Sequence, residues 1–400
     1  MFFLYRLYHF ILKCIVIFIG IPNPQLHKNK NGLTNAIKAL QLTEQSYVLL
    51  ITDHTLQELG IPTSIISEVQ HHKLNVVVFD QVLPNPTIEN VQRGFELYKK
   101  HQCQAIISVG GGSVIDCAKL IGAKAVRPNK AVTDFKGLFK VLKRLPPNIA
   151  IPTTAGTGSE TTVAAVVNCP NTHIKYAATD FVLVPHHAVL LPELTTSLPP
   201  HITATTAIDA LTHAIEALLS INCMAFSQKR ALEACALIFD NLPTAYSEAT
   251  HSHARSQLLS ASFYAGQAFT RTSVGYIHAI SHQLSANYNT PHGLANAILL
   301  MPVLQWYGER IQSHMALIAR HCQLTSLDHP IERQADDALN AIEHLLIQCQ
   351  IPNYFTEINA EDIQNLARAA LNEAHPDYPV PVFMSHYECE NIIKSVSTVD

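Results

Sequence analysis

The side chains best suited to chemistry lie in two short segments of the second half of the chain. Asp209 and His213 stand four residues apart, so a helix places both on one face. His278, His282 and His292 follow within fifteen residues of one another in an otherwise apolar setting. Buried imidazoles are costly unless they are paired or ligated. One carboxylate and up to four imidazoles could therefore form a divalent-metal site, and nitrogen and oxygen ligands suit iron(II), zinc, manganese, cobalt or nickel.

Other interpretations of the same residues stay open at this point. An Asp and a His four residues apart, such as Asp209 and His213, more often form a buried structural hydrogen bond than a pair of metal ligands. Glu216 lies three residues beyond His213 and is a rival ligand. His278 and His282 share a helix face, whereas His292 follows Pro291 and is expected to begin the next helix.

The first half of the chain contains a glycine-rich turn at Gly110, Gly111 and Gly112, after an apolar run. Glycines let the backbone approach a phosphate closely, and the free N–H groups of a following helix bind the anion. The turn matches neither the G-x-G-x-x-G spacing nor the Walker motif. A tight turn with a capping box of Ser113 and Asp116 is the structural explanation.

Apolar runs that alternate with helical segments predict an α/β scaffold around this turn. Strands are predicted at 47–51, 74–79, 105–109 and 149–151, and Thr87 is a predicted helix cap. Such alternation favours a mostly parallel sheet, in which ligands bind beyond the carboxyl ends of the strands. Asp53, Asn85, the glycine turn and the segment 153–158 all follow strands, so they could line one crevice.

Asp53 has two interpretations. An acidic residue after a strand can bind the ribose hydroxyls of NAD and repel the extra phosphate of NADP. Turns also favour Asp for purely local reasons.

Strand signals fade after residue 200, where Leu198-Pro199-Pro200 interrupts the pattern. Helices are predicted at 204–219, 228–237, 254–268 and 335–349. We therefore expect an apolar leader at 1–22, an α/β domain at 23–200 and an all-helical domain at 201–400.

The leader is strongly apolar but carries Arg6, His9 and Lys13 on one helical stripe. One interpretation is an amphipathic helix lying in a membrane interface, which would give residues 1–20 a peripheral membrane contact. The second is a helix packed on the protein body or on a partner. The third, a signal sequence or membrane span, is weaker because the longest uncharged stretch is too short to cross a bilayer.

Composition limits the class of protein. The 400 residues carry 27 Lys+Arg and 31 Asp+Glu, a formal charge of 27 − 31 = −4, which argues against a nucleic-acid partner. Hydrophobic residues at 48% against 14% charged residues indicate a folded chain with a large core. None of the 9 cysteines stands in C-x-x-C spacing, so we expect a reducing compartment, the cytoplasm.

Four segments resemble those of the iron-containing (group III) alcohol dehydrogenases, in the order expected for that family. They are G-G-G-S-V-I-D-C-A-K, P-T-T-A-G-T-G-S-E, D-A-L-T-H-A-I-E and H-A-I-S-H-Q-L-S-A-N-Y-N-T-P-H-G. The resemblance runs from about residue 45 to the C-terminus. It implies an N-terminal dinucleotide-binding α/β domain with a mostly parallel sheet, and an all-α C-terminal domain. The metal is expected in the cleft between them.

The resemblance also implies roles for individual residues. Its metal ligands are Asp209, His213, His278 and His292. His282 corresponds to the histidine near the nicotinamide and becomes a candidate proton relay, while Glu216 falls to a structural role. The implied cofactor contacts are Asp53, Asn85, Gly110, Gly111, Gly112, Ser113, Thr153, Thr154, Thr157 and Lys175.

The implied activity is reversible hydride transfer between an alcohol and NAD(P), with an aldehyde or ketone as the product. Iron(II) is the expected metal, with zinc as the alternative. NAD is favoured over NADP because of Asp53, and a homodimer or larger assembly is expected. The alternatives are a zinc-dependent, glycerol-type polyol dehydrogenase and a membrane-attached NAD-binding scaffold without turnover.

Overall fold

The computed structural model describes residues 2–169 and 174–398. The chain divides into two compact units. One, called here the α/β unit, is Ile21–Ser197. The other, called the helical unit, combines Met1–Gly20 with Leu198–Asp400, so the leader belongs to the helical unit.

Within the described residues, the α/β unit contains a six-stranded parallel sheet in the order β1-β9-β6-β4-β2-β3. Its strands are β1 (Gln25–Lys28), β2 (Tyr47–Ile51), β3 (Asn75–Phe79), β4 (Ala105–Gly110), β6 (Asn148–Pro152) and β9 (His187–Leu190). The helices are α2 (Asn29–Ala39), α3 (His54–Glu58), α4 (Thr63–His71), α5 (Ile88–Lys100) and α6 (Gly112–Val126). A smaller sheet, also counted over the described residues, has β5 (Gly137–Leu138), β7 (Ala164–Cys169) and β8 (Ile174–Thr179).

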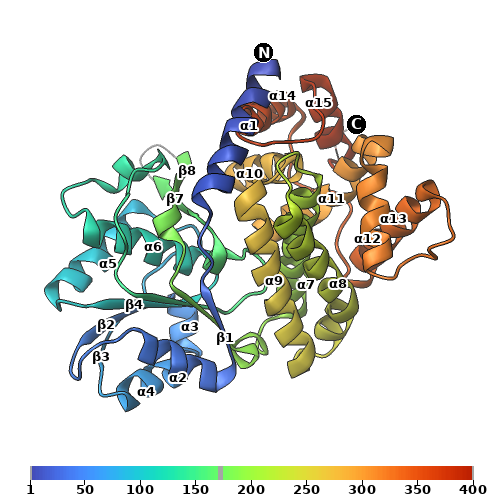
Figure 1. Cartoon of the computed structure of the whole chain (residues 1–400). Helices are drawn as coiled ribbons and strands as arrows, with labels where there is room; N and C mark the ends of the chain where they lie inside the picture. Colours follow the sequence, from blue (N-terminus) through green and yellow to red (C-terminus); the bar gives the residue numbers. More distant parts are fainter. Residues whose placement is uncertain (1, 170–173, 399–400) are drawn as a thin grey trace. The chain divides into compact units, whose positions relative to one another are not determined.

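Helices cover both faces of the large sheet. Alternate side chains of β2 point to opposite faces: Val48 and Leu50 pack with α2 and α4, whereas Leu49 and Ile51 pack with α5 and α6. Figure 1 shows α2 and α4 on one side of the sheet and α5 and α6 on the other. Burial on both faces explains why the strands are continuous apolar runs in the sequence.

The four predicted strands are confirmed, and Thr87 caps α5 as expected, through a capping box with Asn90. The sequence prediction missed β1, β9 and the smaller sheet. β1 and β9 have only four residues each, and β1 reads Gln-Leu-His-Lys. Such short strands acquire their structure from pairing with each other rather than from a local pattern.

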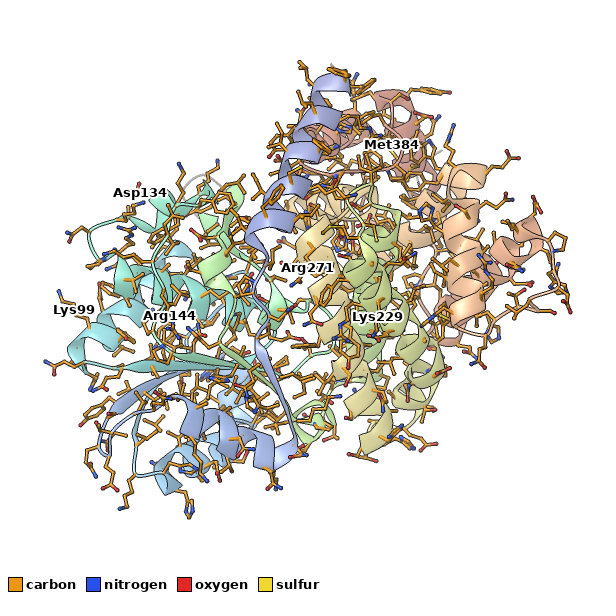
Figure 2. All side chains as sticks on the ribbon, viewed as in Figure 1. Lys99, Asp134, Arg144, Lys229, Arg271 and Met384 are labelled. Atoms are coloured by element: carbon orange, nitrogen blue, oxygen red, sulfur yellow. The ribbon has the colours of Figure 1, made fainter. Side chains whose placement is uncertain are left out.

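The helical unit is built from long helices that include the four predicted ones. They are α7 (Pro200–Leu219), α8 (Ala225–Ser247), α9 (Ser252–Thr272), α10 (Tyr276–Tyr288), α11 (His292–Tyr307), α12 (Gln312–His321), α13 (Ile331–Gln348), α14 (Ile363–Ala374) and α15 (His386–Ser395). Charged side chains such as Lys229 on this unit, and Lys99 and Asp134 on the α/β unit, lie on the outside (Figure 2).

Helix α1 (Phe2–Ile19) packs on the helical unit through its polar stripe, beside α14 and α15 (Figure 1). The Arg6 guanidinium donates hydrogen bonds to the carbonyl oxygens of Val380 at 2.6 Å and Pro381 at 2.9 Å. It also lies 4.3 Å from the ring centroid of Phe383. These contacts correspond to the second interpretation of the leader, a helix packed on the protein body.

Further polar contacts extend along the same stripe. His9 is fully buried, and its Nε2 lies 2.5 Å from the carbonyl oxygen of Pro376. Asn222 donates to the carbonyl oxygen of His9 at 3.2 Å, and Lys13 donates to that of Ile221 at 3.2 Å. The basic residues of the leader are therefore engaged by the protein itself.

Large apolar side chains of α1 are exposed. They are Phe2, which also stacks on Phe383, and Phe3, Leu4, Leu7, Phe10, Ile11, Ile17, Phe18 and Ile19. Within the described residues, α1 is the one helix that is both long enough and apolar enough to cross a membrane, judged by length and composition. Core helices of soluble proteins and signal sequences share this length and composition.

Replacing Arg6 by Met keeps the apolar stem of the side chain but removes its hydrogen bonds and its contact with Phe383. We expect the free energy of unfolding to fall by about 2 kcal/mol, because hydrogen bonds from a charged group contribute about 1.5–3 kcal/mol. Calorimetry should then show a melting temperature lower by roughly 4–8 °C. Lys13→Met is the matched control, since its ammonium makes an exposed bond worth less than about 1 kcal/mol. Equal shifts in both variants would contradict this account.

Candidate active site

Three side chains of the helical unit bring ligand atoms together. Asp209 on α7, His278 on α10 and His292 at the first residue of α11 place one ligand atom each within 4.8 Å of one another. Asp209 Oδ1 lies 3.6 Å from His278 Nε2 and 3.5 Å from His292 Nε2. Ligand atoms about 2.1 Å from a metal in tetrahedral geometry are about 3.4 Å apart, so these separations suit a divalent ion.

His213 lies beside this cluster but does not bond to Asp209. Its ring stacks on that of His278, with centroids 4.4 Å apart, and its Nδ1 is 3.9 Å from Asp209 Oδ1. Among the described residues this buried Nδ1 has no hydrogen-bond partner. The structural alternative, a simple Asp–His hydrogen bond, is therefore not what the structure contains.

Asn296, which the sequence prediction missed, lies where the ligand atoms converge. Its Nδ2 donates to Asp209 Oδ1 at 2.7 Å and lies 3.1 Å from His278 Nε2 and 3.2 Å from His292 Nε2. Its Oδ1 is buried and has no partner in the part of the chain that the structure describes. Since an amide has only two N–H groups, it cannot satisfy all three acceptors. The spacing His292-x-x-x-Asn296 on a helix was the available signal.

Glu216 holds His278 in place from the side opposite Nε2. One carboxylate oxygen accepts from His278 Nδ1 at 2.6 Å and from the Gly275 N–H at 2.7 Å, and the other accepts from the Ile277 N–H at 2.8 Å. A Cβ at Gly275 would lie 2.8 Å from Glu216 Oε1, so this approach needs glycine. A carboxylate on Nδ1 fixes the ring and leaves Nε2 to a ligand.

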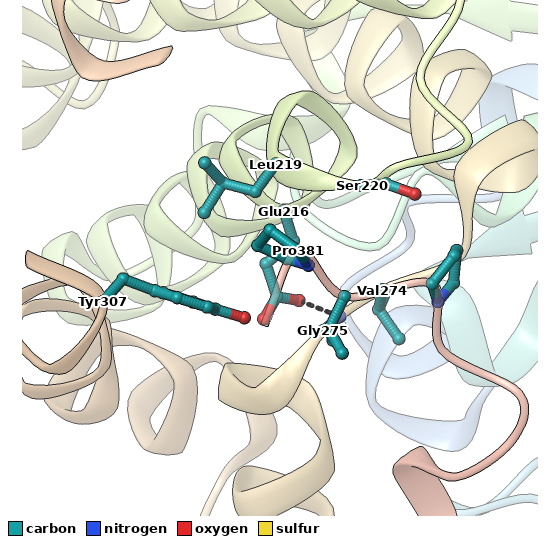
Figure 3. A pocket seen from close by; sticks show the side chains of 9 residues that line it. Glu216, Leu219, Ser220, Val274, Gly275, Tyr307 and Pro381 are labelled. Atoms are coloured by element: carbon teal, nitrogen blue, oxygen red, sulfur yellow. Dashed lines mark hydrogen bonds between the residues drawn. The ribbon is translucent and has the colours of Figure 1, made fainter. Parts of the chain in front are cut away.

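Figure 3 shows this carboxylate with its bond to the Gly275 N–H in a small cavity that Leu219, Tyr307 and Pro381 also line. The cavity volume is about 10 Å³, room for about one water molecule. It is therefore not a substrate pocket.

Charges within the cluster are strongly coupled. Burial opposes the ionisation of Asp209, but the imidazoles of His213, His292 and His278 outweigh it and hold the Asp209 pKa well below its usual range. Burial lowers the pKa of His213 to about 3. Burial also opposes a charge on His278, yet Glu216 and Asp209 raise its pKa to about 9. Asp209 is thus ionised and His213 neutral, the states that bind a metal, whereas His278 must release a proton from Nε2 to bind one.

His282 lies next to the cluster without belonging to it. Its ring stacks on His292 with centroids 5.2 Å apart, and its side chain is 40% exposed. Its Nδ1 lies 2.5 Å from Glu373 Oε1. The sequence prediction also missed Glu373, because it lies on α14, ninety-one residues away and outside every motif.

The α/β unit brings the predicted glycine turn and the threonine segment together at one edge of its large sheet. Gly110 ends β4 and Gly112 begins α6, and the Thr153 N–H donates to the Gly110 carbonyl oxygen at 3.1 Å. A Cβ at Gly112 would lie 2.8 Å from Thr157 Oγ1, and one at Gly111 would lie 3.4 Å from Thr154 Oγ1. The glycine turn and the threonine segment are therefore in contact, and glycine permits it.

The predicted capping box of Ser113 and Asp116 is wrong. Within the described residues, α6 has Gly111 at its N-cap and no side-chain cap. Ser113 Oγ donates to the Pro84 carbonyl oxygen, next to Asn85, and Asp116 accepts from Ser159 Oγ. Both side chains link α6 to neighbouring loops, and the free N–H groups at its start stay available to an anion.

Asp53, Asn85 and Lys175 differ in how the structure places them. Asp53 follows β2 and caps α3, accepting from the Leu56 N–H at 2.9 Å. Asn85 is exposed in the loop after β3. Lys175 lies on β8 opposite Asn168 in the smaller sheet, and its side chain is outside the described residues.

Comparison with known proteins agrees with this architecture. The family model "Iron-containing alcohol dehydrogenase" matches residues 24–192, and "Fe-containing alcohol dehydrogenase family, C-terminal" matches residues 203–397. A two-domain, metal-dependent dehydrogenase is the class that this combination defines. The chain belongs to the iron-containing alcohol dehydrogenase family. It is an oxidoreductase that acts on alcohols with a metal and a nicotinamide dinucleotide.

Individual relatives align over most of their length. Alcohol dehydrogenase 4 of Schizosaccharomyces pombe is 34% identical over 372 residues, which are 92% of this chain and 86% of the relative. The 1,3-propanediol dehydrogenase of Citrobacter freundii is 32% identical over 359 residues, 89% and 92% of the two chains. A solved 1,3-propanediol oxidoreductase superposes with a TM-score of 0.89 at 30% identity, covering 94% and 99%. These matches do not favour the polyol dehydrogenase or the scaffold without turnover.

Replacing Glu216 by Gln removes the negative charge on His278 Nδ1 but keeps the side-chain volume. We expect iron(II) affinity to fall about 10- to 100-fold, because losing a partner of a metal-binding histidine has that effect. Competition with a coloured chelator would measure it. Glu233→Gln on α8 is the control, and an unchanged affinity in Glu216→Gln would contradict the assigned role.

Proposed function

We propose that the protein is an NAD-dependent dehydrogenase of alcohols that uses iron(II), with Asp209, His213, His278 and His292 as the metal ligands. The observation that carries this proposal is the convergence of Asp209 Oδ1, His278 Nε2 and His292 Nε2 on one point. The polar atoms left without partners nearby, His213 Nδ1 and Asn296 Oδ1, support it among the described residues.

The donor set fits a divalent metal. One carboxylate and three imidazoles supply oxygen and nitrogen ligands, which suit iron(II) and zinc alike. Iron is proposed over zinc because the chain belongs to the iron-containing family.

Oxidation of an alcohol breaks its C–H and O–H bonds, with the hydride passing to the nicotinamide and the proton to water. When bound, the metal supplies Lewis acidity to the alcohol oxygen. Glu216 keeps the His278 ring oriented, and the buried Asp209 supplies negative charge. His282, half-exposed beside His292, takes the hydroxyl proton and releases it to solvent. Short primary alcohols are the proposed substrate class.

The proposed dinucleotide site uses the carboxyl edge of the large sheet. The backbone of Gly110, Gly111, Gly112 and Ser113 binds the pyrophosphate at the start of α6. Thr153, Thr154 and Thr157 lie against that turn, and Asn85 and Lys175 contribute further contacts. Asp53 favours NAD over NADP by repelling the additional phosphate. The protein is proposed to work in the cytoplasm as a homodimer or larger assembly.

Replacing His278 by Ala should remove the metal and lower turnover of short primary alcohols by at least about 10²-fold, since Lewis-acid stabilisation is worth several kcal/mol. The measurement is iron content and NAD reduction on the same anaerobically purified sample. His344→Ala, on the exposed side of α13, is the control. A variant that keeps both iron and activity would refute the ligand assignment.

Replacing Asp53 by Ser keeps a residue that caps α3 but removes the carboxylate. We expect kcat/KM for NADP relative to NAD to rise about tenfold, or 1.4 kcal/mol, because the repulsion of the extra phosphate is lost. Steady-state kinetics with both cofactors would measure it, with Glu58→Gln as the control. An unchanged ratio would limit Asp53 to capping.

A further inference from the structure

The polar surroundings of His282 lead to a residue outside all the motifs, Glu373 on α14. Glu373 Oε1 lies 2.5 Å from His282 Nδ1 and accepts from the Tyr378 hydroxyl at 2.7 Å. Its Oε2 accepts from Gln283 Nε2 at 2.7 Å. Both oxygens of Glu373 accept hydrogen bonds from other side chains, and these bonds keep the carboxylate facing the imidazole.

The chemistry of these partners decides which nitrogen of His282 carries the proton. Burial opposes the ionisation of Glu373, but His282 and the Tyr378 hydroxyl outweigh it and lower the pKa. Burial and the nearby Glu373 charge raise the Tyr378 pKa well above its usual value, so the phenol stays protonated. An ionised carboxylate only accepts hydrogen bonds. His282 Nδ1 must therefore be the donor, and in a neutral ring Nε2 then holds the lone pair.

The ring of His282 is also confined by its neighbours. It stacks on His292, with an interplanar angle of 22°, and meets the ring of His278 edge-on at a centroid distance of 5.9 Å. With Nδ1 bound to Glu373, Nε2 is the nitrogen left to exchange a proton, and the side chain is 40% exposed.

The segment that carries Tyr378 is itself held by the leader helix. Arg6 donates to the Val380 and Pro381 carbonyl oxygens, and His9 Nε2 lies 2.5 Å from that of Pro376. The family models begin at residue 24, so this support comes from a part of the chain outside them.

We propose that Glu373 is the positioning residue of His282, which it holds with the proton on Nδ1 and with Nε2 as the atom that exchanges the substrate proton. The role rests on the proposed function, in which His282 is the proton relay. Tyr378 and Gln283 keep the carboxylate in place. A carboxylate that orients a histidine in this way stabilises the imidazolium that forms when Nε2 takes a proton.

The test is a double-mutant cycle with Glu373→Gln, His282→Gln and the combined variant. Each single variant should lower kcat for alcohol oxidation about 10²-fold, the usual contribution of a positioned acid or base. Their KM values for alcohol and NAD, and their iron content, should stay close to those of the wild type. The combined variant should be no slower than the slower single variant, because Glu373 acts only through His282. Glu361→Gln, an exposed carboxylate just before α14, is the control.

A second readout does not need turnover. The zinc-loaded protein should give a proton resonance downfield of the amide region, from His282 Nδ1–H bound to the carboxylate. It should be absent in both single variants and present in Glu361→Gln. Tyr378→Phe removes one bond to Glu373 and keeps the ring, so it tests the network if Glu373→Gln does not fold. Its several-fold loss in kcat should disappear in the His282→Gln background.

Two results would overturn the proposal. The first is a Glu373→Gln variant whose kcat stays within twofold of that of the wild type. The second is a combined variant in which the two losses in kcat multiply, because independent effects indicate a purely structural role for Glu373. If the wild type oxidises no alcohol, the proposed function fails, and the resonance still decides whether Glu373 positions His282.

Discussion

The burial of one carboxylate among imidazoles is the constraint on which the helical unit depends. Asp209 is 2% exposed, and an isolated ionised carboxylate in such surroundings would be expensive. It is tolerable because three imidazoles and the Asn296 amide lie around it. Each of these must come from a helix that is itself held in place: α7 supplies Asp209, His213 and Glu216, and α10 and α11 supply the rest. The oxygen and nitrogen atoms that converge here are more than the Asn296 amide can satisfy. A divalent cation would bind them together.

Two carboxylates outside the proposed ligand set orient histidines of α10 in the same manner. Glu216 binds His278 Nδ1, and Glu373 binds His282 Nδ1. In both cases the acidic residue comes from a different helix, so the tautomer of each ring is set by tertiary packing. The same arrangement leaves Nε2 of His278 to the cluster, and Nε2 of His282 is the atom proposed to exchange the substrate proton. Two histidines four residues apart on one helix are thereby proposed to differ in their chemistry.

The α/β unit is proposed to bring backbone N–H groups close to an anionic cofactor. Parallel strands end at one edge of the sheet, and the turn after β4 contacts the threonine segment after β6 because glycine leaves room for Thr154 and Thr157. Asp116 and Ser113, which might have capped α6, instead bind neighbouring loops. The start of α6 thus keeps the free N–H groups that an anion needs.

The sequence by itself determined the class of fold, most of the core strands and helices, and the residue types of the metal cluster. It could do so because hydrophobic periodicity and i, i+4 spacing are local properties of the chain. Only the tertiary structure decided that β1 and β9 are strands, since each is too short to be recognised without its partner. It also decided the docking of the leader, in which Arg6 meets carbonyl oxygens more than 370 residues away. Glu373 joined the site for the same reason, because contacts between helices distant in sequence leave no local pattern. Asn296 lies four residues from His292 on the same helix, but only the tertiary structure brings its amide to Asp209 and His278.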